Sequence, residues 1–117
     1  MSQYNIGSKA FTAGEALEAN RRVKLSTGSG TQVEYADAGD AFIGITAAAA
    51  NLNEMVTVDL KTTGRTFKVV ANGAIAVGGS FYGALDGKVS ATVSGAIQGR
   101  VLEASASDGE VVEAILL

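Results

Sequence analysis

Three pairs of carboxylates are the side chains of this sequence best suited to chemistry. They are Glu15 with Glu18, Asp37 with Asp40, and Asp108 with Glu110. A carboxylate pair can divide the roles of general acid and general base, as in glycoside hydrolysis. Each pair, however, falls in a predicted turn or loop, and no catalytic partner can be named for any of them. We therefore expect no catalytic residues and no enzymatic activity.

The composition excludes most other chemistry. The chain contains no histidine and no cysteine, which rules out histidine-based triads, thiol nucleophiles, zinc–thiolate sites and disulfides. The acidic turn from Asp37 to Asp40 lacks the later bidentate glutamate of a calcium-binding loop. We therefore expect no metal ion and no cofactor, and a fold that is stabilised by packing.

Two short motifs could in principle bind phosphate groups. Gly28-Ser29-Gly30 is followed by no Gly-Lys-Ser/Thr motif and no long helix, so we predict an ordinary hairpin loop. Arg21, Arg22 and Lys24 form the one basic group, which we interpret as a solvated strand face. With a net charge of -3 and a pI near 4.8, we expect no nucleic-acid partner.

The sequence also contains no recognisable membrane-spanning segment or signal peptide. No stretch approaches 18 consecutive apolar residues, and the N-terminus has no basic start followed by an apolar run. We expect no membrane partner and no secretion by a signal peptide.

The elements that would position these side chains are organised around a repeat. The segment 43–60 has a second copy at 98–117, in which Gly99 follows Gly44 by 55 residues and Glu110 follows Glu54 by 56. Each copy reads as a hairpin that ends in an alternating strand. The alternation predicts the inward-facing side chains of both copies: Val56, Val58, Leu60, Val112, Ala114 and Leu116.

Glycine turns divide the rest of the chain into short strands. We predict strands at 22–25, 32–35 and 66–71, and a hairpin at 81–92 that turns at Asp86-Gly87. The segment 13–17 is echoed by 78–82, at an offset of 65. Ala47–Leu52 is too short for a stable helix, so we expect a loop or a single helical turn there.

These elements predict an all-β protein, a small β-barrel or sandwich with at most one short helix. We expect a flexible N-terminal arm at 1–11 and a single β domain at 12–117. The domain would be built from two similar hairpin-containing halves, about 12–60 and 74–117, packed about a pseudo-twofold axis.

The arm carries three apolar side chains, Tyr4, Ile6 and Phe11, among small polar residues. A frayed end and a segment that docks onto a partner are both compatible with this pattern. In the second case the three side chains would be the anchors.

Apolar residues also recur on the outward face of the predicted hairpins. Opposite the inward set lie Val111, Ile115 and Leu117, and in the first copy Ile43 and Ile45 take the positions that Gln98 and Arg100 hold in the second. Such a face would suit a subunit interface. A second buried face within the monomer would give the same pattern, and the sequence leaves both possibilities open.

Beyond these patterns, the chain resembles the capsid cement or head-decoration proteins of tailed bacteriophages. The resemblance covers about residues 12–117, and its middle part, 44–68, is also similar to lambda-type head-decoration proteins. It lies in the order of turns and strands that includes 38–46, 53–58, 74–82, 86–89 and 99–104.

This resemblance implies a structural virion protein, made in the host cytoplasm, that binds the outer surface of the expanded phage capsid and stabilises it. The implied partner is the major capsid protein, and the implied state is a homo-oligomer, often a trimer. The alternative is a small β module that binds carbohydrate or peptide on a phage or bacterial surface. Sugar sites usually stack rings on aromatic side chains, and the low aromatic content of 6% without tryptophan weakens this alternative.

Overall fold

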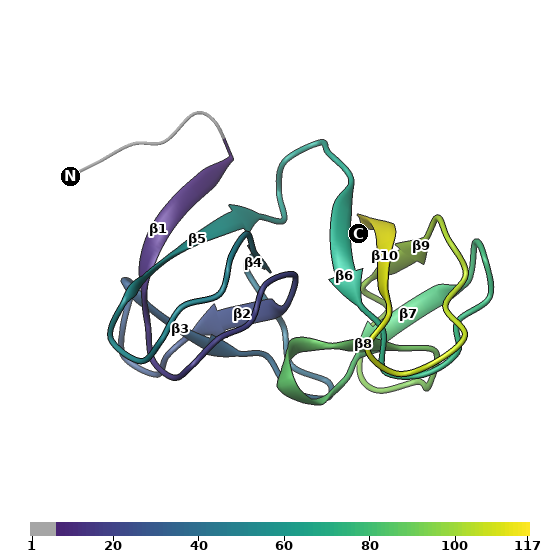
Figure 1. The fold of residues 1–117 in the computed structure, drawn as a ribbon, viewed down its shortest axis with the longest axis horizontal. Helices are drawn as coiled ribbons and strands as arrows, with labels where there is room; N and C mark the ends of the chain where they lie inside the picture. Colours follow the sequence, from purple (N-terminus) through teal and green to yellow (C-terminus); the bar gives the residue numbers. More distant parts are fainter. Residues whose placement is uncertain (1–6) are drawn as a thin grey trace.

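The computed structural model describes residues 7–117, which form two lobes of short strands side by side along the long axis (Figure 1). The only helical element in this range is a three-residue 3-10 turn, η1 (Leu85–Gly87). The predicted all-β fold with two similar halves is therefore confirmed. The strands of the first lobe are β1 (Ser8–Ala13), β2 (Arg22–Leu25), β3 (Gln32–Tyr35), β4 (Gly44–Thr46) and β5 (Met55–Leu60). Those of the second lobe are β6 (Phe67–Val70), β7 (Ser80–Gly83), β8 (Val89–Ser90), β9 (Gly99–Val101) and β10 (Val111–Leu116).

The first lobe is a closed barrel with the strand order β1-β3-β2-β4-β5, in which β5 pairs back onto β1. Its pairs are antiparallel except for β1 with β3, where Thr12 and Ala13 lie beside Gln32 and Val33. The barrel is filled by a compact group of buried apolar side chains: Phe11, Ala13, Leu17, Val23, Val33, Ala50, Val56 and Val58.

The second lobe repeats this ladder pair by pair. Its order, β6-β10-β9-β7-β8, is the same circuit opened between β6 and β8. A single parallel bridge between Ala71 and Val89 stands where Ala13 pairs with Val33 in the first lobe. The second lobe is thus a curled sheet that one bridge almost closes.

The loops repeat as well. The glutamate that follows each loop bonds back to it: Glu54 accepts the backbone N–H of Asn51, and Glu110 accepts that of Ala106. The predicted alignment of Glu54 with Glu110, and of Gly44 with Gly99, is confirmed by the strand registers.

The predicted echo of 13–17 in 78–82 is wrong. The bridge from Leu17 to Ala50 has its counterpart in the bridge from Ile75 to Ser105, so this part of the repeat is offset by 58 residues. The offset sets Gly78 against Asn20, and both residues have a positive φ, 74° and 63°. The predicted alignment matched glycine with glycine and was therefore wrong, because in the first lobe Asn20, and not a glycine, adopts the left-handed conformation.

Side-chain alternation on the two terminal strands of the lobes follows the prediction. Val56, Val58, Val112 and Ala114 are buried, and Leu60 and Leu116 pack at the edges of the two cores. The segment 47–52 forms turns without a helix.

The predicted arm boundary is wrong at Phe11. Strand β1 already begins at Ser8 and pairs with β5 from that residue on, and the Phe11 side chain is buried in the barrel core. Its apolar ring completes the first lobe, because the strand alternates from the half-exposed Lys9 to buried Phe11 and Ala13.

The two lobes share one core at their junction. Ala36, Phe42 and Ile45 of the first lobe pack among the interior side chains of the second lobe, such as Phe67 and Val69. They fill the side that the open circuit leaves uncovered. The second lobe therefore depends on the first for part of its apolar interior.

At the same junction the Arg22 side chain is fully buried. Its Nη2 donates hydrogen bonds to the carbonyl oxygens of Ala36 (2.8 Å) and Ala84 (2.7 Å), and its Nε donates to that of Lys88 (3.0 Å). Its Nη1 donates to Oε1 of Gln98 at 3.1 Å. The solvated strand face predicted for the basic group is therefore wrong at Arg22, whose donors join both lobes.

Burial lowers the pKa of Arg22 to about 10, an effect that the nearby charges of Asp40 and Asp37 oppose. The guanidinium stays protonated at neutral pH, so a full positive charge is held inside the molecule. Backbone carbonyls, rather than a contacting carboxylate, supply most of its acceptors.

The contact between the lobes does not follow a twofold axis. The first lobe contributes Arg22 and Ile45, whose counterparts by strand register are Ser80 and Arg100. The second lobe instead contributes Ala84, Lys88 and Gln98, a different part of the repeat. The expected pseudo-twofold packing is therefore wrong, and the contact is heterologous.

Glycine is required at the matching positions Gly44 and Gly99. A Cβ at Gly44 would clash with the backbone oxygen of Asp59, and one at Gly99 would clash with that of Ile115 and with the Phe81 ring. We expect Gly99→Ala to lower the free energy of unfolding by about 1–3 kcal/mol, because the ring and the strand must shift.

The matched control is Gly64→Ala in the β5–β6 loop, where an added Cβ meets nothing within 4 Å. We expect this change to stay within about 0.5 kcal/mol of the parent. Urea denaturation of both variants measures the difference. Equal midpoints for the two variants would contradict the assigned close approach.

Replacing Arg22 tests the polar junction. Arg22→Met removes donors from the buried carbonyls of Ala36 and Ala84, and each orphaned acceptor costs about 1–3 kcal/mol. Because the substitution also removes a buried charge, we expect a net loss of about 2–4 kcal/mol of unfolding free energy. The control is Arg100→Met at an exposed strand position, where we expect a change within about 0.5 kcal/mol. An Arg22→Met midpoint in urea equal to that of Arg100→Met would refute the role of the junction.

Candidate interaction surfaces

The carboxylate pairs singled out in the sequence bond to the backbone and side chains of their own surroundings. Glu15 accepts the backbone N–H of Tyr35, and Asp37 accepts that of Asp86. Asp108 pairs with Lys88 at 3.0 Å. These contacts account for the acidic residues as turn and loop stabilisers. No group of three or more acidic side chains that could hold a metal ion occurs within residues 7–117.

Asp40 organises the loop before β4. It accepts a hydrogen bond from Lys24 Nζ at 2.9 Å and another from the backbone N–H of Asp37 at 3.0 Å. The Lys24 bond, followed by the backbone bond, holds the pKa of Asp40 below its usual value, and the same bond raises the pKa of Lys24. Both groups stay charged at neutral pH and fix the loop that presents Phe42 to the second lobe.

The glycine loop between β2 and β3 also stabilises itself. Ser29 Oγ accepts the backbone N–H groups of Thr31 and Gln32 at 3.1 and 3.0 Å. Donors that could face a phosphate are thus used within the turn. The segment is a hairpin loop, as its sequence predicts.

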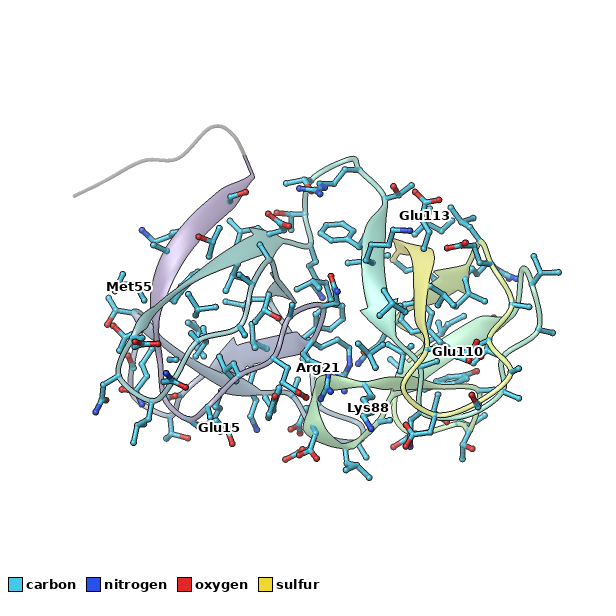
Figure 2. The ribbon with its side chains drawn as sticks, in the orientation of Figure 1. Glu15, Arg21, Met55, Lys88, Glu110 and Glu113 are labelled. Carbon is cyan, nitrogen blue, oxygen red and sulfur yellow. The ribbon has the colours of Figure 1, made fainter. Side chains whose placement is uncertain are left out.

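The seam between the lobes is polar at the surface. Arg21 Nη1 donates to the backbone oxygen of Asp86 at 2.9 Å, and its guanidinium lies 5.7 Å from the Tyr35 ring centroid. Arg21 and Lys88 are both labelled near this seam in Figure 2. These contacts hold the two lobes together and leave no free cationic patch at Arg21.

Two of the predicted interface residues lie inside the monomer. Ile45 is buried between the lobes and belongs to the shared core, so its assignment to a subunit interface is wrong. Ile43 is partly buried against the first-lobe core, so its assignment to an outward face is also wrong. For the first copy, the open alternative of a second buried face within the monomer is the one observed.

The other three predicted interface residues are solvent-exposed. Val111, Ile115 and Leu117 lie on or beside β10, interrupted by Glu113, which Figure 2 labels on the same strand. Further exposed apolar side chains of this lobe are Val77, Leu85, Val93, Ile97 and Leu102; the first lobe exposes Leu25, Leu52 and Met55. Exposed large apolar side chains of the described residues are thus concentrated on the second lobe.

The predicted capsid-binding anchors separate into two groups. Tyr4 and Ile6 lie outside the described residues. Phe11 is a core residue of the first lobe and is unavailable to a partner. The segment that could act as an arm therefore ends before Ser8, where β1 begins.

Two surface hollows of the described residues have no aromatic side chain among the residues that line them. One, of about 330 Å³, is lined by Ala16, Leu17, Glu18, Ala49, Ala50, Asn51 and Glu54. Each phenylalanine of residues 7–117 is buried.

No helix among these residues is long and apolar enough to cross a membrane.

No protein-family profile and no curated protein matches the sequence. Among solved structures, the chain is similar to the N base of head fiber gp8.5 in bacteriophage phi29, with a TM-score of 0.80 and 18% sequence identity. The match covers 94% of this chain and 92% of that chain. It supports the resemblance of the sequence to phage head-decoration proteins at the level of the fold. Over nearly its whole length, this chain therefore shares the fold of the N base of a bacteriophage head fiber.

Proposed function

We propose that this chain is a structural protein of a bacteriophage virion that binds the outer surface of the expanded capsid and stabilises it. The observation that carries the proposal is the fold match, which spans nearly all of both chains. The partner in this proposal is the major capsid protein, and the site of action is the outside of the virion head.

The side-chain inventory is compatible with a mechanical role. The acidic side chains described above bond to neighbouring turns, loops and strands, and the buried charge of Arg22 joins the lobes. Neither arrangement presents a reactive group to a substrate. What the molecule offers to a partner is shape and exposed apolar surface, which is what a capsid-binding protein uses.

Stabilising a shell requires contacts with more than one capsid subunit at once. A homo-oligomer, in our proposal a trimer, presents several copies of the segment 1–6, with Tyr4 and Ile6 as its apolar anchors. Once one copy has bound, the remaining contacts form within the complex at high effective concentration, so modest single contacts add up to tight attachment. Val111, Ile115 and Leu117 are the exposed residues that we assign to subunit contacts.

Binding of the recombinant chain to phage heads tests this proposal. Heads from a phage that lacks the protein would be prepared before and after expansion and cosedimented with the chain. We expect binding to expanded heads and at least tenfold weaker binding to unexpanded ones. Failure of the full chain to bind either form would overturn the capsid role, and binding to a glycan or peptide panel instead would favour the alternative module.

Removing residues 2–6 tests the arm separately. We expect this variant to melt like the parent, because β1 begins at Ser8, and to lose at least tenfold in affinity for expanded heads. A longer deletion, of residues 2–11, is the contrasting variant: it removes Phe11 and most of β1, so we expect it to unfold the barrel. Wild-type occupancy by the shorter truncation would refute the arm and leave the capsid role standing.

A further inference from the structure

Asn72 and Gly73 form the only asparagine–glycine dipeptide of the sequence. In such a dipeptide the backbone nitrogen of the glycine can attack the side-chain carbonyl carbon of the asparagine, because glycine has no side chain that hinders the approach. Asparagine is accordingly among the thermolabile residues of proteins. The pair follows β6 and lies in the turn that leads toward β7.

The structure leaves the reacting groups of this pair accessible. Neither the side-chain amide of Asn72 nor the backbone N–H of Gly73 makes a hydrogen bond to another described residue. Both residues are partly exposed, and an added Cβ at Gly73 would meet nothing within 4 Å. Asn72 also lines a surface hollow of about 320 Å³ together with Gly83 and Ser90. The amide therefore has room to turn toward the glycine nitrogen, and water reaches both groups.

The other asparagines of the described residues lack this combination. Asn20, Asn51 and Asn53 are followed by arginine, leucine and glutamate, respectively. These side chains crowd the backbone nitrogen that would have to attack, so the same reaction is slower there. The three residues therefore serve as internal references for Asn72.

The pair is held between two fixed points of the second lobe. On one side, the backbone N–H of Asn72 donates to the backbone oxygen of Val89 at 2.7 Å, at the bridge that almost closes this lobe. On the other side, Ile75 and Ser105 exchange backbone hydrogen bonds of 3.0 and 2.9 Å, and Ser105 Oγ donates to the backbone oxygen of Gly73 at 2.9 Å. The main chain between these contacts has little slack.

The first lobe shows how weakly the second lobe is closed at this point. In the first lobe the equivalent bond runs from the N–H of Gly14 to the oxygen of Val33 at 2.7 Å, and a further bond runs from the N–H of Thr12 to the oxygen of Thr31 at 2.8 Å. No counterpart of this further bond occurs among the described residues of the second lobe. Its closure therefore depends on the contact beside Asn72.

We propose that Asn72 is a site of spontaneous deamidation and that its isoaspartyl product loosens the bridge that closes the second lobe. The nitrogen of Gly73 loses its proton and forms a bond with Cγ of Asn72, and ammonia leaves, which gives a succinimide ring. Water then adds to one of the two ring carbonyls and opens the ring. One opening gives aspartate. The other gives isoaspartate, whose main chain runs through Cβ and Cγ and is longer by one carbon atom.

The additional backbone carbon falls between the two fixed points, so one of them must give way. We expect the contact with Val89 to lengthen, because Ser105 holds its side with a side-chain hydrogen bond as well as backbone bonds. The aspartyl product keeps the original backbone and adds only a carboxylate, so it separates the effect of charge from that of chain length. The inference does not rest on the proposed function, and its tests use no phage heads.

Ageing of the purified chain in a mildly alkaline buffer tests the site. Peptide mapping by mass spectrometry measures the conversion of amide to carboxyl at each asparagine, and an isoaspartyl methyltransferase labels the isoaspartyl product. We expect Asn72 to convert at least tenfold faster than Asn20, Asn51 and Asn53, and within tenfold of its rate in the urea-unfolded chain. A smaller preference for Asn72 would overturn the site, as would a larger slowing by the fold.

Hydrogen exchange and thermal melting test the structural consequence. We expect the Asn72 amide of the isolated isoaspartyl form to exchange at least tenfold faster than in the parent, with a lower melting temperature. The matched control is Asn72→Asp, which carries the new carboxylate on the original backbone and should exchange and melt like the parent. An isoaspartyl form that behaves like Asn72→Asp in both measurements would overturn the loosened bridge.

Discussion

A positive charge inside the junction is the constraint on which the arrangement of this protein depends. The guanidinium of Arg22 is removed from water. It donates hydrogen bonds to the carbonyl oxygen of Ala36 at the end of β3, to that of Lys88 before β8, and to the side chain of Gln98 before β9. Burying a charge in this way is favourable only if its donors are all matched. The two lobes must therefore sit in one relative position, because a small displacement would leave a charged group and several carbonyls unpaired.

The apolar packing around this charge follows from the open circuit of the second lobe. A five-stranded sheet that is closed by one bridge exposes part of its interior, and the side chains that fill the gap come from the first lobe. The lobes are therefore unequal despite their common ladder. The first lobe is a closed barrel, whereas the second lobe completes its core with Phe42 and Ile45 of the first lobe. The two lobes therefore form one structural unit and not two independent domains.

Much of the fold could be predicted from the sequence because the residues that mark its repeat are ones that the backbone requires at those positions. Gly44 and Gly99 stand where no Cβ fits, and Glu54 and Glu110 bond back to their loops, so these residues mark equivalent places. What covers an outward face could not be predicted in the same way. Strand alternation assigns Arg22 and Ile45 to the outer side correctly, but a period of two says nothing about whether water or another lobe lies there. The prediction that Phe11 belongs to the arm was wrong for a related reason. The sequence pattern of 1–11 does not show that the last residues of this segment pair with a strand more than forty positions later.

The same long-range pairing has a consequence for biosynthesis. Strand β1 leaves the ribosome some forty residues ahead of its main partner β5, so the barrel cannot close until most of the first lobe has been translated. The acceptors of Arg22 on the second lobe are translated later still. A nascent chain halted between the lobes therefore lacks the second-lobe acceptors of Arg22, and these contacts form only after residues 84–98 have been translated.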